Sequence, residues 1–173
     1  SETGFFEAER AKVLSLPGVR AAVPSIAALA YVLRPGRAEP ETLNVLGVDP
    51  QLEPLVRMHR LERAPPAAAA LQALGNPDAI LLPASFAASR SSSAGGSIEI
   101  LAQSGVARLD VAGTLASTSG DESAFAVVGL ATAQRLFGFE GRVMRLDVLV
   151  DDGRDIDALA ADMRALLGPA FAV

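Results

Sequence analysis

Hydrophobic and polar residues alternate along several segments, and this two-residue period is typical of strands with one buried face. Residues 97–102 and 108–115 alternate on either side of a short polar stretch, which predicts a hairpin. Residues 144–150 alternate in the same way and predict a half-buried strand. Less regular apolar runs predict further strands over residues 19–33, 42–48, 79–82 and 124–128.

Helical spacing is clearest near the C-terminal end of the sequence. Apolar residues recur there at intervals of three and four, at Ile156, Leu159, Ala160, Met163, Leu166 and Leu167. Asp155 precedes this stripe and is a residue type that caps helix N-termini. A first helix is predicted from a stripe of Phe6, Val13 and Leu16, and Pro17-Gly18 ends it. Shorter helices are predicted over residues 83–88 and 130–137.

The order of these elements predicts an α+β fold with two lobes. The two most amphipathic helices lie at the chain ends and need a common sheet to bury their apolar stripes. We therefore expect residues 19–33 and 144–150 to share a sheet. Residues 1–50 and 141–173 are predicted to form one discontinuous lobe of strand–helix units. Residues 51–140 are predicted to form a smaller β-rich lobe inserted between them.

Composition narrows the classes of function. The chain has 173 residues, of which 50% are hydrophobic and 20% charged, and this excludes a disordered chain. A net charge of −5 argues against a nucleic-acid partner, which needs a basic face. The chain has no cysteine and one histidine, so thiolate sites and sites with two imidazoles are excluded. No apolar run approaches the ~20 residues that span a bilayer.

Each candidate catalytic or binding motif has a simpler structural interpretation. Gly95-Gly96 lacks the lysine and hydroxyl of a phosphate-binding loop. His59 lies in an arginine-rich run and is interpreted as part of a solvated surface. The acidic run over residues 151–157 resembles a calcium loop, but it lacks the alternating ligands and the closing glutamate. A turn followed by a helix cap explains that run without a metal.

Two further polar stretches are interpreted in the same way. Ser91–Ser93 is expected to be a loop tip. Asp121 and Glu122 are adjacent, and adjacent residues on a strand point to opposite faces. The sequence therefore predicts no catalytic, cofactor-binding or metal site, and no cofactor.

Several short segments, taken in order, resemble a known family. The segments are Leu16–Val19, Ala22–Pro24, Leu46–Pro50, Ala79–Leu82, Leu109–Leu115 with Gly113 near its end, Ala131–Gly138, and Arg145–Val150 followed by an acidic turn and a helix. Their order and spacing resemble the periplasmic core domain of the FtsX-like permeases, the MacB-type family of ABC transporters. The resemblance covers nearly the whole chain, whereas residues 34–41 and 63–73 match nothing in it.

The resemblance implies a non-catalytic domain on the periplasmic or extracellular side of a bacterial inner membrane. In that family the domain lies between the first two membrane helices of a permease, which dimerises and is driven by a separate cytoplasmic ATPase. The implied partners are that ATPase, a second permease copy and envelope proteins. The domain is implied to transmit the ATPase-driven motion or to engage substrate, and the identity of the substrate stays open.

Two alternatives remain from the sequence. One is a stand-alone secreted module that binds lipid, peptide or glycan, and the other is a small hydrolase that uses Asp121, Glu122 and Asp147. If the chain lies between two membrane helices, its two ends must face the same membrane, and this geometry distinguishes the permease domain from the two alternatives. The end helices should run antiparallel, and Ser1 and Val173 should emerge within about 25 Å of each other, a little over two helix diameters.

Overall fold

Six strands close into a ring in the computed structural model, which describes residues 4–33, 40–52, 67–88, 94–115 and 125–168. Around the ring these strands are β2 (Val19–Val32), β3 (Glu41–Val48), β7 (Ala126–Gly129), β4 (Ala79–Pro83), β6 (Gly105–Leu115) and β5 (Ser97–Ala102). The β3–β7 and β4–β6 pairs are parallel and the other pairs are antiparallel. The pairing of β5 with β2 completes the closure.

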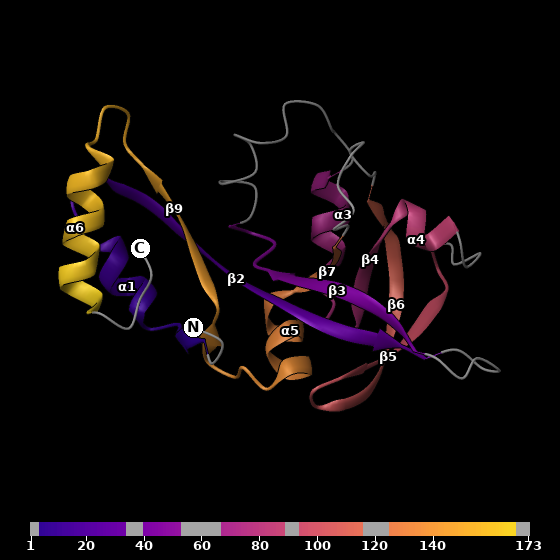
Figure 1. The fold of residues 1–173 in the computed structure, drawn as a ribbon. Helices are drawn as coiled ribbons and strands as arrows, with labels where there is room; N and C mark the ends of the chain where they lie inside the picture. The colour runs from indigo at the N-terminus through magenta and orange to yellow at the C-terminus, as the bar shows by residue number, and fades with distance from the viewer. Residues whose placement is uncertain (1–3, 34–39, 53–66, 89–93, 116–124, 169–173) are drawn as a thin grey trace.

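The main core fills the ring, because alternate residues of every strand point inward. Branched aliphatic side chains dominate it, among them Ile26, Val45, Ile80, Leu82, Ile100, Leu109 and Val111. Helix α5 (Leu130–Phe137) adds Ala133, Leu136 and Phe137 to the same cluster. Figure 1 shows this helix beside β2 and β3.

A second apolar cluster lies outside the ring, under the two end helices. Helices α1 (Glu9–Leu14) and α6 (Ile156–Leu167) lie against the first half of β2 and against β9 (Arg145–Val150). Val13, Ala22, Leu159 and Met163 form the buried centre of this cluster. Figure 1 shows α1, α6 and β9 on one side of the molecule and most of the ring on the other. We call α1, α6, β9 and residues 19–25 of β2 the end unit.

The remaining elements are short. Helix α3 (Ala67–Ala73) precedes Leu74, which packs with Ala79, Leu81 and Val127 on the outer side of the ring. Helix α4 (Ala84–Ala88) follows β4 directly. Strands β1 (Phe5–Phe6) and β8 (Arg142–Val143) form a separate antiparallel pair.

The predicted α+β class is confirmed, and the predicted pairing of residues 19–33 with 144–150 is present as the antiparallel β2–β9 ladder. The hairpin is β5–β6, and Asp155 caps α6 by accepting a hydrogen bond from the Ala158 amide at 3.1 Å. The lobe boundaries at residues 50 and 140 stay a prediction. Strand β3, which precedes the first boundary, pairs with β7 in the ring.

Two predicted apolar stripes are wrong in part. Phe6 belongs to β1 and not to the first helix, because the helix begins three residues later, at Glu9. Its ring is exposed and lies 5.5 Å from the guanidinium of Arg142. In α6, Ile156 and Leu166 are exposed, whereas Leu159 and Met163 are buried. The helix packs only against α1 and the narrow β2–β9 ribbon, so a narrower face is buried than its sequence suggests.

The end helices run in opposite directions, as predicted. The Asp151 amide, just before α6, donates to the Gly18 carbonyl, just after α1, at 2.9 Å. The end of α1 and the start of α6 therefore lie at the same end of the β2–β9 ladder, as Figure 1 also shows. Ser1 and Val173, whose separation was also predicted, lie outside the described residues.

Candidate functional site

The residues considered as catalytic candidates are not brought together in the part of the chain that is described. His59, Ser91–Ser93, Asp121 and Glu122 lie outside the described residues. Asp147, on β9, accepts a hydrogen bond from Nε of Arg145 at 2.8 Å. Gly95 lies in the turn before β5 with φ of 90°, and its amide donates to the Val111 carbonyl at 2.9 Å.

The acidic run after β9 forms a turn and a helix cap, as its sequence predicts. Gly153 has a φ of 79°, a conformation that glycine adopts without strain. Nη2 of Arg154 donates to the carboxylate of Asp162 at 3.1 Å. Asp162 lies about two helical turns beyond the Asp155 cap. Among the described residues, no three histidine, cysteine, aspartate or glutamate side chains are placed to share a metal ion. None of the described helices is long and apolar enough to cross a membrane.

The feature that joins the two parts of the molecule is strand β2. Its first half pairs with β9, from Val19 to Ser25, and its second half pairs with β3, from Ser25 to Val32. Ser25 is matched with Val48 in one ladder and with Arg145 in the other. One continuous strand therefore belongs both to the end unit and to the ring.

The first half of β2 has one edge without a strand partner, and local contacts protect it. The Ser25 carbonyl accepts from the Met144 amide at 3.0 Å, on the β9 side. The nitrogen of Pro24 then faces the opposite edge, where its missing N–H costs no ladder bond. On the same strand the Ala22 carbonyl oxygen accepts a hydrogen bond from Nε of Arg10 at 2.8 Å. Proline and a bound arginine thus limit edge-to-edge pairing.

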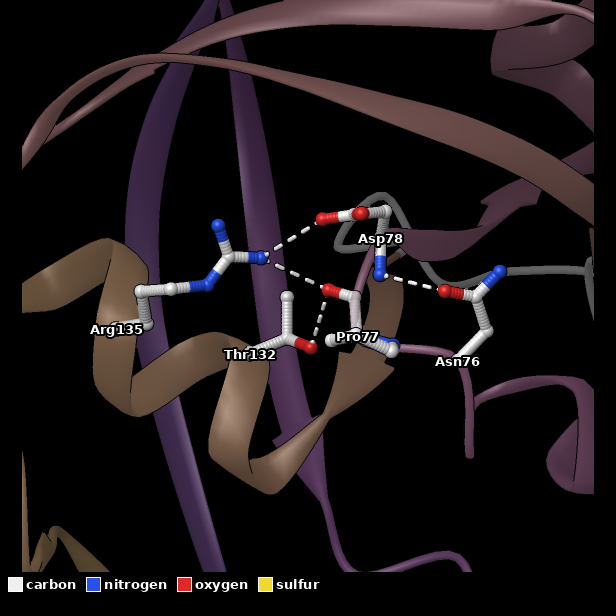
Figure 2. Close-up of polar contacts among 5 residues, drawn as sticks. All are labelled: Asn76, Pro77, Asp78, Thr132 and Arg135. Atoms are coloured by element: carbon white, nitrogen blue, oxygen red, sulfur yellow. Dashed lines mark hydrogen bonds and ion pairs between the residues drawn. The ribbon is translucent and has the colours of Figure 1, made fainter.

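A polar cluster around the Pro77 carbonyl fixes α5 to the turn before β4 (Figure 2). The carbonyl accepts from Oγ1 of Thr132 at 2.7 Å and from Nη2 of Arg135 at 2.9 Å. The same Nη2 lies 3.1 Å from the Asp78 carboxylate. Asn76 accepts from the Asp78 amide at 3.0 Å and shapes the turn. Thr132 is buried, so its hydroxyl needs this acceptor.

Close backbone approaches hold α5 from two more sides. A Cβ built on Gly47 of β3 would lie 2.2 Å from the Cβ of Ala133. A Cβ built on Gly129, before α5, would lie 2.7 Å from the Leu74 carbonyl oxygen. With the Pro77 cluster, these contacts make α5 and the ring one tightly packed body. The hydroxyl of Thr132 and the guanidinium of Arg135 are thus engaged in fixing α5 to the turn before β4.

Comparison with known protein families identifies the family of this chain. The sequence model of the MacB-like periplasmic core domain matches residues 2–166, and the chain belongs to that family. This places it among the periplasmic domains of ABC transporter permeases, which are not a catalytic family. No curated protein matches the chain at a significant level.

Solved structures of such domains share the fold at low sequence identity. The extracellular domain of the noncanonic ABC-type transporter YknZ from Gram-positive bacteria has a TM-score of 0.62 at 14% identity, over 96% of this chain and 84% of that one. The periplasmic region of MacB from Actinobacillus actinomycetemcomitans has a TM-score of 0.61 at 12% identity, over 94% and 72%. A domain of a putative permease from Porphyromonas gingivalis has a TM-score of 0.53 at 12% identity, over 89% and 68%.

Proposed function

We propose that this chain is a mechanical element of its permease, which carries motion driven by a separate cytoplasmic ATPase into the space outside the membrane. The observation that carries the proposal is that the first and last helices of the described chain, α1 and α6, pack in the same end unit and run antiparallel. A domain inserted between two membrane helices needs this arrangement, because both of its connections then leave in one direction.

Strand β2 is the physical connection through which motion would pass from the end unit to the ring. Its 14 residues extend over about 46 Å at ~3.3 Å per residue. The end unit holds the first half through the β9 ladder, and the ring holds the second half through β3. A displacement of the end helices therefore reaches the ring through covalent backbone. The closed ring and the seated α5 favour movement as one body, since packed cores transmit displacement and deform little.

The proposal assigns parts to the two predicted lobes. Residues 1–50 and 141–173 form the membrane-proximal lobe and residues 51–140 the inserted lobe, with β2 and β3 shared with the ring. ATP is bound and hydrolysed on the ATPase chain. The partners are that ATPase, through the membrane helices, a second permease copy, and proteins or substrate outside the membrane.

Cysteine labelling in cells tests the location of the domain. The chain has no cysteine, so Asp152→Cys, in the exposed turn before α6, introduces a unique thiol into this part of the full-length protein. We expect a membrane-impermeant maleimide, given after the outer envelope is made permeable, to label it without cell lysis. Leu82→Cys, fully buried in the ring, is the matched control and should stay unlabelled until denaturation.

The labelling result has two contrary outcomes. Labelling of position 152 only after lysis would place the domain in the cytoplasm and end the proposal. Recovery of the labelled protein free of the membrane would support a secreted binding module instead. The mechanical role itself is tested by measuring whether the distance between the domains of two permease copies changes when the ATPase binds ATP.

A further inference from the structure

Four hydrophobic side chains lie exposed on the outer surface of the ring, where a small domain usually presents polar groups. Leu29 is 47% exposed, Tyr31 39%, Leu101 40% and Val106 63%. The strand registers make them neighbours, because Tyr31 is opposite Leu101 and Leu101 is opposite Val106. Leu29 lies two residues from Tyr31 and so faces the same way. We call these four residues the outer apolar row.

The row crosses the strands β2, β5 and β6, which are neighbours in the sheet. Neighbouring strands are about 4.8 Å apart, so the side chains of Tyr31, Leu101 and Val106 are within reach of one another. Figure 1 shows β5, β6 and the second half of β2 on the side of the molecule away from α1 and α6. The row is thus separate from the end unit and from the Pro77 cluster.

A pair of opposite charges lies directly beside the row. Glu99 and Arg108 are opposite each other in the β5–β6 ladder, two residues from Leu101 and Val106 on the same face. Both are exposed, and within the described part of the chain neither side chain makes an ion pair. An acid and a base therefore stand side by side on the exposed face next to the row.

We propose that the outer apolar row is the surface on which a second copy of this chain packs, through a two-fold interface. An isologous interface requires a patch that is complementary to itself. A neutral apolar row satisfies this against its own copy. The charge pair satisfies it as well, since the Glu99 carboxylate of one copy can meet the Arg108 guanidinium of the other. The proposal rests on the proposed function only in naming the second permease copy as the occupant.

The size of the row sets the strength of the contact. Four partly exposed side chains offer on the order of 300 Å² of apolar surface, the scale of an ordinary surface patch. A stable dimer buries about 800 Å² on each partner. The contact is therefore weak for the chain alone and becomes populated when membrane segments hold two copies close together. We therefore expect the chain alone to be mostly monomeric in solution.

Disulfide trapping of the isolated chain detects such a weak contact. Val106→Cys places a thiol in the row, and Thr114→Cys places one at another exposed position of the same strand, eight residues from Val106. Under a mild oxidant at equal concentrations, we expect the Val106→Cys chain to form covalent dimers at least tenfold faster. Circular dichroism checks that both variants keep the fold. Equal rates for the two variants would overturn the proposal.

A charge exchange then tests the two-fold pairing. Glu99→Arg and Arg108→Glu, each combined with Val106→Cys, should each slow the cross-linking, because each copy then carries two like charges at the contact. Mixing the two should restore it, with the mixed dimer, recognised by mass, as the main product. Statistical mixing of the three dimers would contradict the paired charges.

Other occupants give different results. If the row binds lipid, the isolated chain will float with phosphatidylglycerol vesicles, Val106→Asp will abolish the flotation, and the Val106→Cys and Thr114→Cys chains will cross-link equally. That outcome rejects the second copy. The labelling of position 152 in cells does not depend on any of these results, so a failure of this proposal is distinguishable from a failure of the proposed function.

Discussion

Replacing Gly47 with alanine should destabilise the domain by displacing α5 from the ring. The added Cβ would lie 2.2 Å from the Cβ of Ala133, and carbon atoms pack at about 3.5–4.0 Å. Both atoms are fixed directly to backbone, so no side-chain rotation relieves the overlap. The helix cannot move freely either, because Thr132 and Arg135 hold it to the Pro77 carbonyl.

The loss of unfolding free energy can be estimated from the effect of overpacking in other protein cores. Added atoms in a well-packed core cost about 1–3 kcal/mol, and replacing glycine regains at most ~1 kcal/mol through the unfolded chain. We expect Gly47→Ala to lose about 1–2 kcal/mol of unfolding free energy in urea titrations. For a chain of this length the Tm should fall by roughly 2–8 °C, at ~2–4 °C per kcal/mol.

A double-mutant cycle ties that loss to the proposed contact. Ala133→Gly alone should cost about 1 kcal/mol of helix propensity, but in the Gly47→Ala background it should restore part of the stability. Gly113→Ala is the matched control, because its added Cβ would meet only a flexible Leu81 methyl at 3.4 Å. Unchanged stability of Gly47→Ala, or strictly additive effects of the two substitutions, would refute the reasoning.

Three further outcomes are expected. In urea titrations Thr132→Val should lose about 1 kcal/mol of unfolding free energy, because it removes the buried hydroxyl that donates to the Pro77 carbonyl. Thr132→Ser keeps a hydroxyl and should lose less. Equal losses for the two variants would show that the hydrogen bond does not contribute. Asp155→Ala should lose about 1 kcal/mol with the cap on the Ala158 amide, and a similar loss for Asp152→Ala, in the exposed turn, would remove the capping explanation. Calorimetry with ATP or Zn²⁺ should detect no binding tighter than about 10 μM, near 7 kcal/mol. Tighter binding would contradict the prediction that the chain has no nucleotide or metal site.

The elements that the sequence predicted well are those whose signals are local. Alternation marked the β5–β6 hairpin and β9, where the two faces of a strand see different surroundings. The Asp155 cap follows from chemistry within one turn of the chain, because its carboxylate bonds the backbone amide three residues on. The family resemblance rested on the order of such local segments.

The closure of the ring depends on pairings that leave no local signal. Strand β3 meets β7 where Val45 faces Ala126, and a short apolar run does not specify which distant run it pairs with. The Pro77 cluster depends on a backbone carbonyl, which any residue carries. Phe6 was wrongly assigned to the first helix, because three apolar residues at helical spacing do not show where a helix begins. The exposure of Leu29 and Tyr31 was not predicted either, because the sequence of β2 is an irregular apolar run that does not show which face is outward.

The proposed mechanical role requires that the domain moves when the ATPase binds nucleotide. The most direct measurement places a spin label at Asp152→Cys in the full-length permease, reconstituted with its ATPase, and records the distance between the labels of the two copies. The account predicts that the distance distribution shifts between the nucleotide-free and ATP-bound states, and that no shift occurs with an ATPase variant unable to bind ATP. An identical distribution in the two states, with ATP binding verified, would contradict it.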